Sequence, residues 1–260
     1  MSYSPKDREV ERERYNRRAL HARFRGLGCD GAESVSVPLR GPYLVFERLV
    51  RSFSSNGCEV LDVCCGDGVF SLVAASRGAR ITVSDIAEEN LGLVVLRAER
   101  YGVPIQTVAA AAEAIPLPDS SFSIITCAGG LSYLDHDSFF REVVRLLHPG
   151  GRFVFVDSLD HNPIYRLNRY IHFLRGRRTF STLQRMPTLQ TVALLRRYFT
   201  HVEVSYHGLF SFAAPLSHLV GEKRFARWSD AIDRALPFCC RMAFKIVGSA
   251  QRPIQNLEGN

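Results

Sequence analysis

Residues 59–68, with the sequence EVLDVCCGDG, combine a short apolar run with two closely spaced glycines. The apolar run is typical of a buried strand, and residues 69–75 after the glycines have the composition of a helix start. A strand–glycine–helix turn brings backbone N–H groups close to a ligand, because glycine places no Cβ in the way. Asp62 lies near the strand end, where its carboxylate can accept a hydrogen bond. The segment therefore predicts a ligand-binding turn around Gly66 and Gly68.

A second acid follows at the distance expected in nucleotide-binding folds. Residues 79–84 (ARITVS) predict another strand, and Asp85 ends it roughly twenty residues after the glycine turn, where an acid binds ribose hydroxyls. The dinucleotide pattern G-x-G-x-x-G is incomplete, since counting from Gly66 reaches Ser71. The spacing therefore favours a ribose-containing ligand and disfavours NAD or FAD. Capping of the next helix is the alternative role for Asp85.

Candidate proton-transfer residues follow the predicted fourth and fifth strands, at the sheet edge where α/β proteins bind ligands. Residues 127–137 (CAGGLSYLDHD) offer Tyr133 and His136, and residues 157–163 (DSLDHNP) offer His161. A neutral histidine can take the proton from an attacking hydroxyl. His161 is the first choice, because the chain turns there into an arginine-rich segment. The alternatives are structural: His161 capping the next helix, His136 in a helix N-terminal turn, and Tyr133 packing.

The segment 161–202 contains many arginines and neither Asp nor Glu. Apolar residues recur at three- and four-residue steps over 163–175, which predicts an amphipathic helix. Arginine forks match phosphate or carboxylate geometry, so we expect Arg166, Arg177 and Arg178 to contact an anionic acceptor from a lid. A solvated basic face is the alternative, and contact of the helix with anionic lipid also stays open.

The predicted elements alternate between strand and helix, which is typical of a parallel sheet. Strands are expected near 59–64, 80–84, 104–109, 122–127 and 152–157, with helices near 68–77, 87–101 and 137–147. Two helices precede them, a solvated one over 7–18 and one over 42–53. A helix from Pro187 to about Tyr198 and another near 222–235 follow. Residues 202–206 and 242–246 predict a final antiparallel pair of strands.

Composition narrows the class of protein and its ligands. The net charge of +7 is compatible with an anionic substrate, an acidic membrane surface or nucleic acid. The seven cysteines include adjacent pairs at Cys64-Cys65 and Cys239-Cys240 without metal-ligand spacing, so we expect reduced thiols and no metal site. No apolar run approaches the roughly 20 residues of a membrane span. The charged N-terminus lacks a signal-peptide pattern, which makes the cytoplasm the expected location.

Four segments together resemble the class I S-adenosylmethionine-dependent methyltransferases. LDVCCGDG resembles motif I of that family, and the further matches come in the family's order over roughly residues 45–160. They are TVSDIAEENL (82–91), AEAIPLPDSSFSIITC (112–127) and EVVRLLHPGGRFVFVD (142–157). The chain is most similar to the small-molecule branch, resembling methyltransferase type 11.

The resemblance implies an α/β fold, a Rossmann-like three-layer sandwich. Its seven-stranded sheet would be mostly parallel with an antiparallel C-terminal strand. The implied organisation is an N-terminal helical cap over 1–40 and a methyltransferase domain over 41–250. A basic lid insertion lies near 161–200 of that domain, and 251–260 form a frayed tail.

The resemblance also implies the cofactor, S-adenosylmethionine, and its contacts. The glycine turn would lie near the methionine moiety and the acid after the second strand near the ribose. Two departures matter: Cys64 replaces the first glycine of motif I, and Ala111 stands where the family often has an adenine-contacting acid. The implied cofactor-binding residues are Asp62, Cys64, Gly66, Gly68, Asp85, Ile86, Ala112, Glu113 and Cys127.

We interpret the chain as a methyltransferase for a small or lipid-linked, anionic acceptor, modified at oxygen. The Asn/Asp-Pro-Pro-Tyr motif of many DNA methylators is not matched by CAGGLSY. The alternatives are a non-catalytic cofactor-binding scaffold and an RNA methyltransferase. A nucleic-acid partner is disfavoured because the arginines are not interleaved with aromatic residues that could stack on bases. Nothing in the sequence indicates an oligomeric state.

Overall fold

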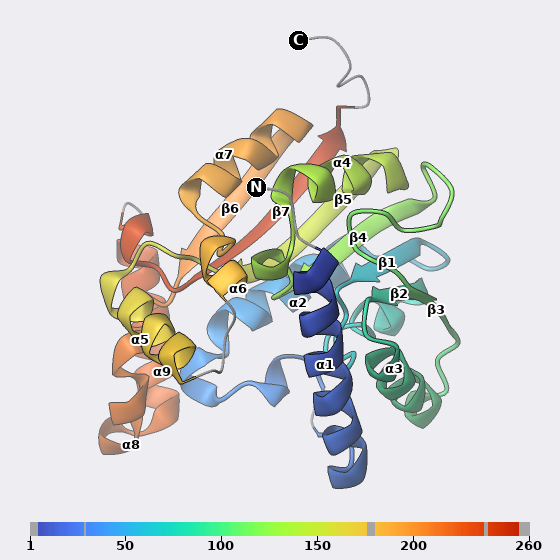
Figure 1. Ribbon diagram of the computed structural model, residues 1–260. Coiled ribbons are helices and arrows are strands. Elements are labelled where there is room, and N and C mark those ends of the chain that lie inside the picture. The colour runs from blue at the N-terminus through green and yellow to red at the C-terminus, as the bar shows by residue number, and fades with distance from the viewer. Residues whose placement is uncertain (1–4, 29, 176–179, 237–238, 255–260) are drawn as a thin grey trace.

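The computed structural model describes residues 5–28, 30–175, 180–236 and 239–254. Seven strands form one sheet in the order β3-β2-β1-β4-β5-β7-β6 (Figure 1). β7 is antiparallel to both of its neighbours, and the pairs among β1 to β5 are parallel. The expected seven-stranded, Rossmann-like sheet with an antiparallel C-terminal strand is confirmed. The strands are β1 Glu59–Val63, β2 Arg80–Asp85, β3 Ile105–Ala109, β4 Phe122–Ala128, β5 Leu147–Ser158, β6 Phe199–His207 and β7 Lys245–Pro253.

Helices cover both faces of this sheet. The α-helices are α1 Pro5–Arg25, α2 Gly41–Phe53, α3 Glu88–Tyr101, α4 His136–Leu146, α5 Pro163–Leu174, α6 Phe180–Gln184, α7 Leu189–Tyr198, α8 Ser217–Val220 and α9 Glu222–Ala235. Short 3₁₀ turns connect several of them: η1 Gly31–Ser34, η2 Val37–Leu39, η3 Ala74–Arg77, η4 Leu131–Tyr133, η5 Ser211–Leu216 and η6 Cys240–Met242.

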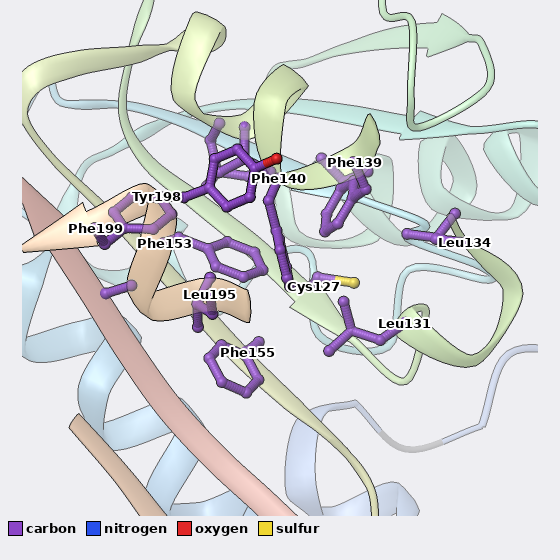
Figure 2. Packing of buried hydrophobic residues seen from close by; sticks show 14 of the residues in the cluster. Cys127, Leu131, Leu134, Phe139, Phe140, Phe153, Phe155, Leu195, Tyr198 and Phe199 are labelled. Atoms are coloured by element: carbon purple, nitrogen blue, oxygen red, sulfur yellow. The ribbon is translucent and has the colours of Figure 1, made fainter. Parts of the chain in front are cut away.

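Alternation along β5 divides the core into two clusters. Phe153 and Phe155 point to one face, where they pack with residues of α4 and α7. Figure 2 shows this cluster, with the rings of Phe140 and Tyr198 beside Phe153. Val154 and Val156 point to the opposite face and pack with residues of α2 and α3. Because successive side chains of β5 point to opposite faces of the sheet, helices pack on both faces, and the sheet becomes the middle of three layers.

Residues 69–77 do not form the helix that the sequence predicts. Turns run from Val69 onward, and only η3, Ala74–Arg77, is helical, in 3₁₀ form. The carbonyl of Val69 accepts a hydrogen bond from the amide of Gly31 at 2.7 Å, so it is engaged outside the segment. Phe70 and Leu72 accept bonds from residues three positions on. A distant backbone donor therefore competes with the α-helical ladder at its first turn.

Three other boundaries differ from the expectation. β5 begins at Leu147 and includes the two glycines 150–151, which were expected to form the turn before it. β7 covers 245–253, whereas Met242 lies in η6, so the last strand starts later and runs into the segment expected to be frayed. α1 is longer than predicted and is not a solvated helix, since Glu11 and Ala19 are buried.

Candidate functional site

A cavity of about 300 Å³ opens at the carboxyl ends of β1, β2 and β4, and we call it the strand-end cavity. This is the edge where parallel α/β sheets bind ligands. Its wall comes from the glycine turn 64–67, the end of β2, the segment 110–113, the loop 128–130 and α1. α1 lies in front of these strand ends in Figure 1. Segments distant in the sequence therefore meet around one pocket.

The glycine turn has three residues in the left-handed region. Cys64 has a φ of 55°, Gly66 of 55° and Gly68 of 77°. A Cβ added to Gly66 would meet nothing within 4 Å, so the space beside it is open, and Gly66 lines the cavity. A Cβ on Gly68 would lie 2.8 Å from both Cγ atoms of Val94, which places Gly68 against α3 and away from the cavity lining. Gly66 therefore leaves space for a ligand, whereas Gly68 allows the turn to pack closely against α3.

Asp85 lines the cavity and braces the glycine turn. Its Oδ2 accepts a hydrogen bond from the amide of Gly66 at 2.8 Å. Its Oδ1 accepts bonds from the amide of Ala87 at 2.8 Å and from Asn90 Nδ2 at 3.3 Å. Burial raises the pKa of Asp85, and the bonds from Ala87 and Gly66 oppose that rise. Asp85 therefore lines the cavity and binds the amide of Ala87, the N-cap residue of α3, rather than a backbone amide within that helix.

Asp62 also lines the cavity, but both of its oxygens are engaged inside the protein. Oδ2 accepts a bond from Ser71 Oγ at 2.6 Å, and Oδ1 accepts one from Thr126 Oγ1 at 2.7 Å. Burial raises the pKa of Asp62 to about 6. The carboxylate therefore connects β1 to β4 and to the turn after Gly68.

The hydroxyl of Ser84 is a buried polar group at the cavity. Ser84 is 1% exposed and precedes Asp85 in β2. Among the described residues, its Oγ has no hydrogen-bond partner, and Ser84 lines the cavity. Leaving a buried hydroxyl unpaired costs about 1–3 kcal/mol. A ligand able to pair with this hydroxyl would recover that cost. Sequence reasoning missed Ser84, since a serine in a strand carries no signal of its own.

Two thiols and a glycine form a tight contact beside the turn. A Cβ added to Gly130 would lie 2.7 Å from Cys64 Cβ and 2.8 Å from Cys127 Sγ. Cys64 lines the cavity, whereas Cys127 is 1% exposed and lies behind it. A hydrogen bond with Cys127, together with burial, raises the pKa of the Cys64 thiol well above its usual range. Cys64 is therefore a packed thiol and a poor nucleophile.

The segment after β3 supplies another part of the wall. Ala111, Ala112 and Glu113 line the cavity together with Ile86. Glu113 Oε1 accepts a bond from the amide of Asp135 at 3.1 Å. Its Oε2 lies 3.4 Å from Arg8 Nη2 of α1. Glu113 therefore connects the loop after β4 with the helix that covers the cavity.

α1 contributes Arg8, Glu11 and Tyr15 to the lining, opposite Tyr133. The rings of Tyr15 and Tyr133 meet edge to face, with centroids 5.7 Å apart. Burial and the neighbouring Tyr133 raise the pKa of Tyr15 far above its usual range, so its phenol stays protonated. The three α1 residues share one helical face at steps of three and four residues. All three are polar or amphipathic, so the apolar periodicity used to find buried faces could not identify them.

The two histidines predicted as bases lie outside the cavity lining. His136 Nε2 is 3.0 Å from the carbonyl of Leu131, and its Nδ1 is 3.3 Å from Thr191 Oγ1. Burial lowers the pKa of His136. His161 Nε2 accepts a bond from the amide of Leu189 at 2.9 Å, at the start of α7. His136 lies in the first turn of α4, as its structural alternative expected, whereas His161 binds the start of α7 and the N-cap of the next helix, α5, is Asn162. Of the three catalytic candidates, only Tyr133 lines the cavity.

Arg166, one of the three arginines predicted to contact the acceptor, does not line the cavity. The side chain of Arg166 is 65% exposed, and its Nε lies 3.6 Å from Asp160 Oδ2. Arg177 and Arg178 lie outside the described residues. Among the charged side chains of the lining, acids outnumber bases, with one arginine, Arg8, and five acids: Glu11, Asp62, Asp67, Asp85 and Glu113. This balance favours a ligand with positive charge.

Within the part of the chain that the structure describes, no group of three or more His, Cys, Asp or Glu side chains could hold a metal ion. The polar groups that line the cavity include carboxylates, hydroxyls, phenols and backbone amides.

Comparisons with known proteins match part of this chain to methyltransferases. Residues 60–151 match the family model described as "Methyltransferase domain". A protein named ubiquinone biosynthesis O-methyltransferase, from Aeromonas salmonicida, is 37% identical over 110 residues, which is 41% of this chain and 45% of that protein. The chain thus spans about half the length of the curated relatives it matches.

Solved structures share the fold. The geranyl diphosphate C-methyltransferase from Streptomyces coelicolor, crystallised with S-adenosyl-L-homocysteine, has a TM-score of 0.57 at 15% identity, over 80% of this chain and 78% of that chain. The cyclase SpnF has a TM-score of 0.55 at 20% identity, over 81% of this chain and 80% of that chain. The two neighbours are named for different reactions, so likeness of fold leaves the reaction open.

Proposed function

We propose that this chain, a member of the class I S-adenosylmethionine-dependent methyltransferases, transfers a methyl group from S-adenosylmethionine to a hydroxyl of a small or lipid-linked acceptor. The observation that carries the proposal is the hydrogen bond between Asp85 and the glycine turn, together with the free space beside Gly66. Asp85 binds the amide of Gly66, and the space beside Gly66 is free of protein atoms out to 4 Å.

The residues of the cavity fit the cofactor. Ser84 Oγ is a buried hydroxyl without a partner among the described residues. Ser84 lines the cavity together with Asp85 and Cys64. The acidic lining suits a ligand that carries a sulfonium and an ammonium group. Asp85 and Ser84 would hold the ribose side. Gly66 would leave room for the methionine side, and the backbone of Ala111 and Ala112 would border the base.

S-adenosylmethionine supplies the methyl group in activated form, so the protein's task is to bind, orient and exclude water. Tyr15 of α1 and Tyr133 of η4 line the cavity with their rings in contact, and we propose that the acceptor binds beside them. Glu11 and Glu113 are the carboxylates on that side and could accept the proton that leaves the hydroxyl. Glu11 accepts a bond from Thr182 Oγ1 at 3.2 Å, which also joins α1 to α6.

The named activities of the relatives and the charges of the cavity lining both bear on the class of acceptor. Relatives from Aeromonas salmonicida and Sodalis glossinidius are named for O-methylation in ubiquinone biosynthesis. The acidic lining disfavours a negative group beside the cofactor, and Arg166 lies away from the cavity. We therefore propose a hydroxyl-bearing acceptor without a required anionic group, which departs from the anionic acceptor expected from the sequence.

The test is methyl transfer from S-adenosylmethionine labelled in the methyl group. The acceptor panel contains prenylated catechols, simple phenols and polyprenyl phosphates, and the product is separated into organic and aqueous phases. Transfer to a phenolic hydroxyl by the wild type, strongly reduced in Asp85→Ala, supports the proposal. Transfer to polyprenyl phosphate alone would contradict the hydroxyl acceptor.

A cofactor-binding scaffold is the second candidate, because Cys64 and Ala111 depart from the family's motifs at the cavity wall. The same panel distinguishes it. A scaffold would bind S-adenosylmethionine and release no S-adenosylhomocysteine with any acceptor, whereas an enzyme would release it with at least one.

A further inference from the structure

The apolar stripe of α5 faces away from the protein. Ile164, Leu167, Ile171 and Leu174 recur at steps of three and four residues, which places them on one side of the helix. Their exposed fractions are 46%, 62%, 37% and 66%. An amphipathic helix of a globular protein normally turns such a stripe towards the core. Here the usual orientation is reversed.

Polar contacts on the other side of α5 hold this orientation. Asn162 is fully buried, with Oδ1 accepting a bond from the amide of Ile164 and Nδ2 donating to the carbonyl of Met242 at 2.8 Å. Arg169 is 4% exposed and donates to Asp160 Oδ1 at 2.7 Å. The ring of Tyr165 stacks on Phe244 at 4.3 Å. Turning the stripe inward would break these contacts, so the outward orientation is built in.

A second exposed apolar segment adjoins this helix. The ring of Tyr165 stacks on Phe244, and a Cβ added to Gly208 would lie 3.2 Å from Phe244 Cβ and would also meet Ser211 Oγ, so the start of η5 lies beside α5. Around it, exposed side chains extend along η5 and α8: Phe210, Phe212, Leu216, Leu219 and Val220, of which Leu219 is 71% exposed. α5, α8 and α9 gather on the same side of the molecule in Figure 1. We call the stripe and this segment together the apolar face.

The charges around the apolar face are mainly basic. Neither Asp nor Glu occurs from 161 to 202 or from 208 to 221. Exposed bases border it at Arg166 and Arg175 of the α5 region and at Lys223, Arg224 and Arg227 of α9, with Glu222 as an exposed acid among them. Trp228, 54% exposed, adds an amphipathic ring at the edge. Apolar side chains flanked by bases and an aromatic ring are the composition of an interfacial membrane surface.

We propose that the apolar face docks onto an anionic phospholipid bilayer, with the leucines entering the acyl boundary and the bases among the headgroups. The basic charge around the apolar face favours a bilayer over a second copy of the chain, because two copies would bring like charges face to face. The docking is peripheral, since no described helix is long and apolar enough to cross a membrane. This inference does not depend on methyl transfer.

The test is sedimentation with vesicles of phosphatidylcholine, with and without phosphatidylglycerol. The key variant is Leu167→Gln with Leu174→Gln, which keeps the charge unchanged. The matched control is Val10→Gln with Leu20→Gln, two apolar residues of α1 that are 50% and 41% exposed. Thermal melting and titration with S-adenosylmethionine check that both double variants are folded.

We expect the wild type to bind vesicles containing phosphatidylglycerol about tenfold or more tightly than vesicles without it, and added salt to weaken the binding. The Leu167/Leu174 variant should bind about tenfold or more weakly than the wild type, with the control within about twofold. Absence of vesicle binding by the wild type, or an equal loss in both double variants, would overturn the proposal. A concentration-dependent dimer that only the Leu167/Leu174 variant abolishes, without vesicle binding, would reassign the face to self-association.

Discussion

Replacing Asp62 with asparagine should stabilise the protein at neutral pH and leave it unchanged in mild acid. The carboxyl is 3% exposed, and burial raises its pKa from 3.8 to about 6. The folded state therefore holds a proton between these values that the unfolded chain has released. Stability contributed by this group is fully present below about pH 4, falls as the pH rises to about 6, and stays lower above that.

The size of the effect follows from the same shift. Raising a pKa from 3.8 to about 6 corresponds to roughly 3 kcal/mol of stability lost on ionisation. Asparagine has the same shape and no charge. Ser71 and Thr126 both bind Asp62 through hydroxyls, and a hydroxyl can accept a bond from the new amide as readily as it donated before. Asp62→Asn should therefore avoid the cost of ionisation without leaving a partner unpaired.

Urea unfolding of the wild type and Asp62→Asn at about pH 4 and about pH 7.5 measures this difference. We expect similar free energies of unfolding in acid and a variant more stable by up to roughly 3 kcal/mol at the higher pH. Asp62→Ala is the control, because it removes the charge and also strands both hydroxyls. An offset between wild type and Asp62→Asn that is the same at both pH values would refute the reasoning.

Three further substitutions test the packing around the cavity. Ser84→Ala should stabilise the free protein by about 1 kcal/mol, because it removes a buried unpaired hydroxyl, and should weaken S-adenosylmethionine binding severalfold by calorimetry. Gly68→Ala should cost about 1–3 kcal/mol in urea unfolding, because its φ is positive and its Cβ would press on Val94. Gly130→Ala should lower the melting temperature, since its Cβ would lie under 3 Å from Cys64 and Cys127.

The strands and the acid after β2 were predictable, because buried parallel strands read as short apolar runs and the glycine turn marks where β1 ends. The helix expected over 68–77 is wrong, since the carbonyl of Val69 in its first turn accepts a bond from Gly31, more than thirty residues earlier in the chain. A local sequence pattern cannot reveal a hydrogen-bond donor that comes from a distant part of the chain.

The particular α1 residues that line the cavity and the outward orientation of the apolar stripe of α5 escaped prediction for a related reason. Periodicity identifies an apolar stripe but not the side on which the helix packs. In α5 the packing side is chosen by Asn162 and Arg169, which find partners in Met242 and Asp160. The orientation of His136 is likewise set by its contacts with Leu131 and Thr191, which belong to other elements. Tertiary contacts of polar side chains decide these cases.

Calorimetric titration with S-adenosylmethionine tests the central claim most directly. The variants are Asp85→Ala and a matched control, Glu59→Ala. Glu59 lies at the opposite end of β1, away from the cavity lining, where it pairs with Arg80. We expect binding by the wild type and by Glu59→Ala, and binding at least about tenfold weaker in Asp85→Ala, with melting curves confirming that all three proteins are folded. No binding by a folded wild type, or equal affinity in Asp85→Ala, would contradict the assignment of the strand-end cavity to this cofactor.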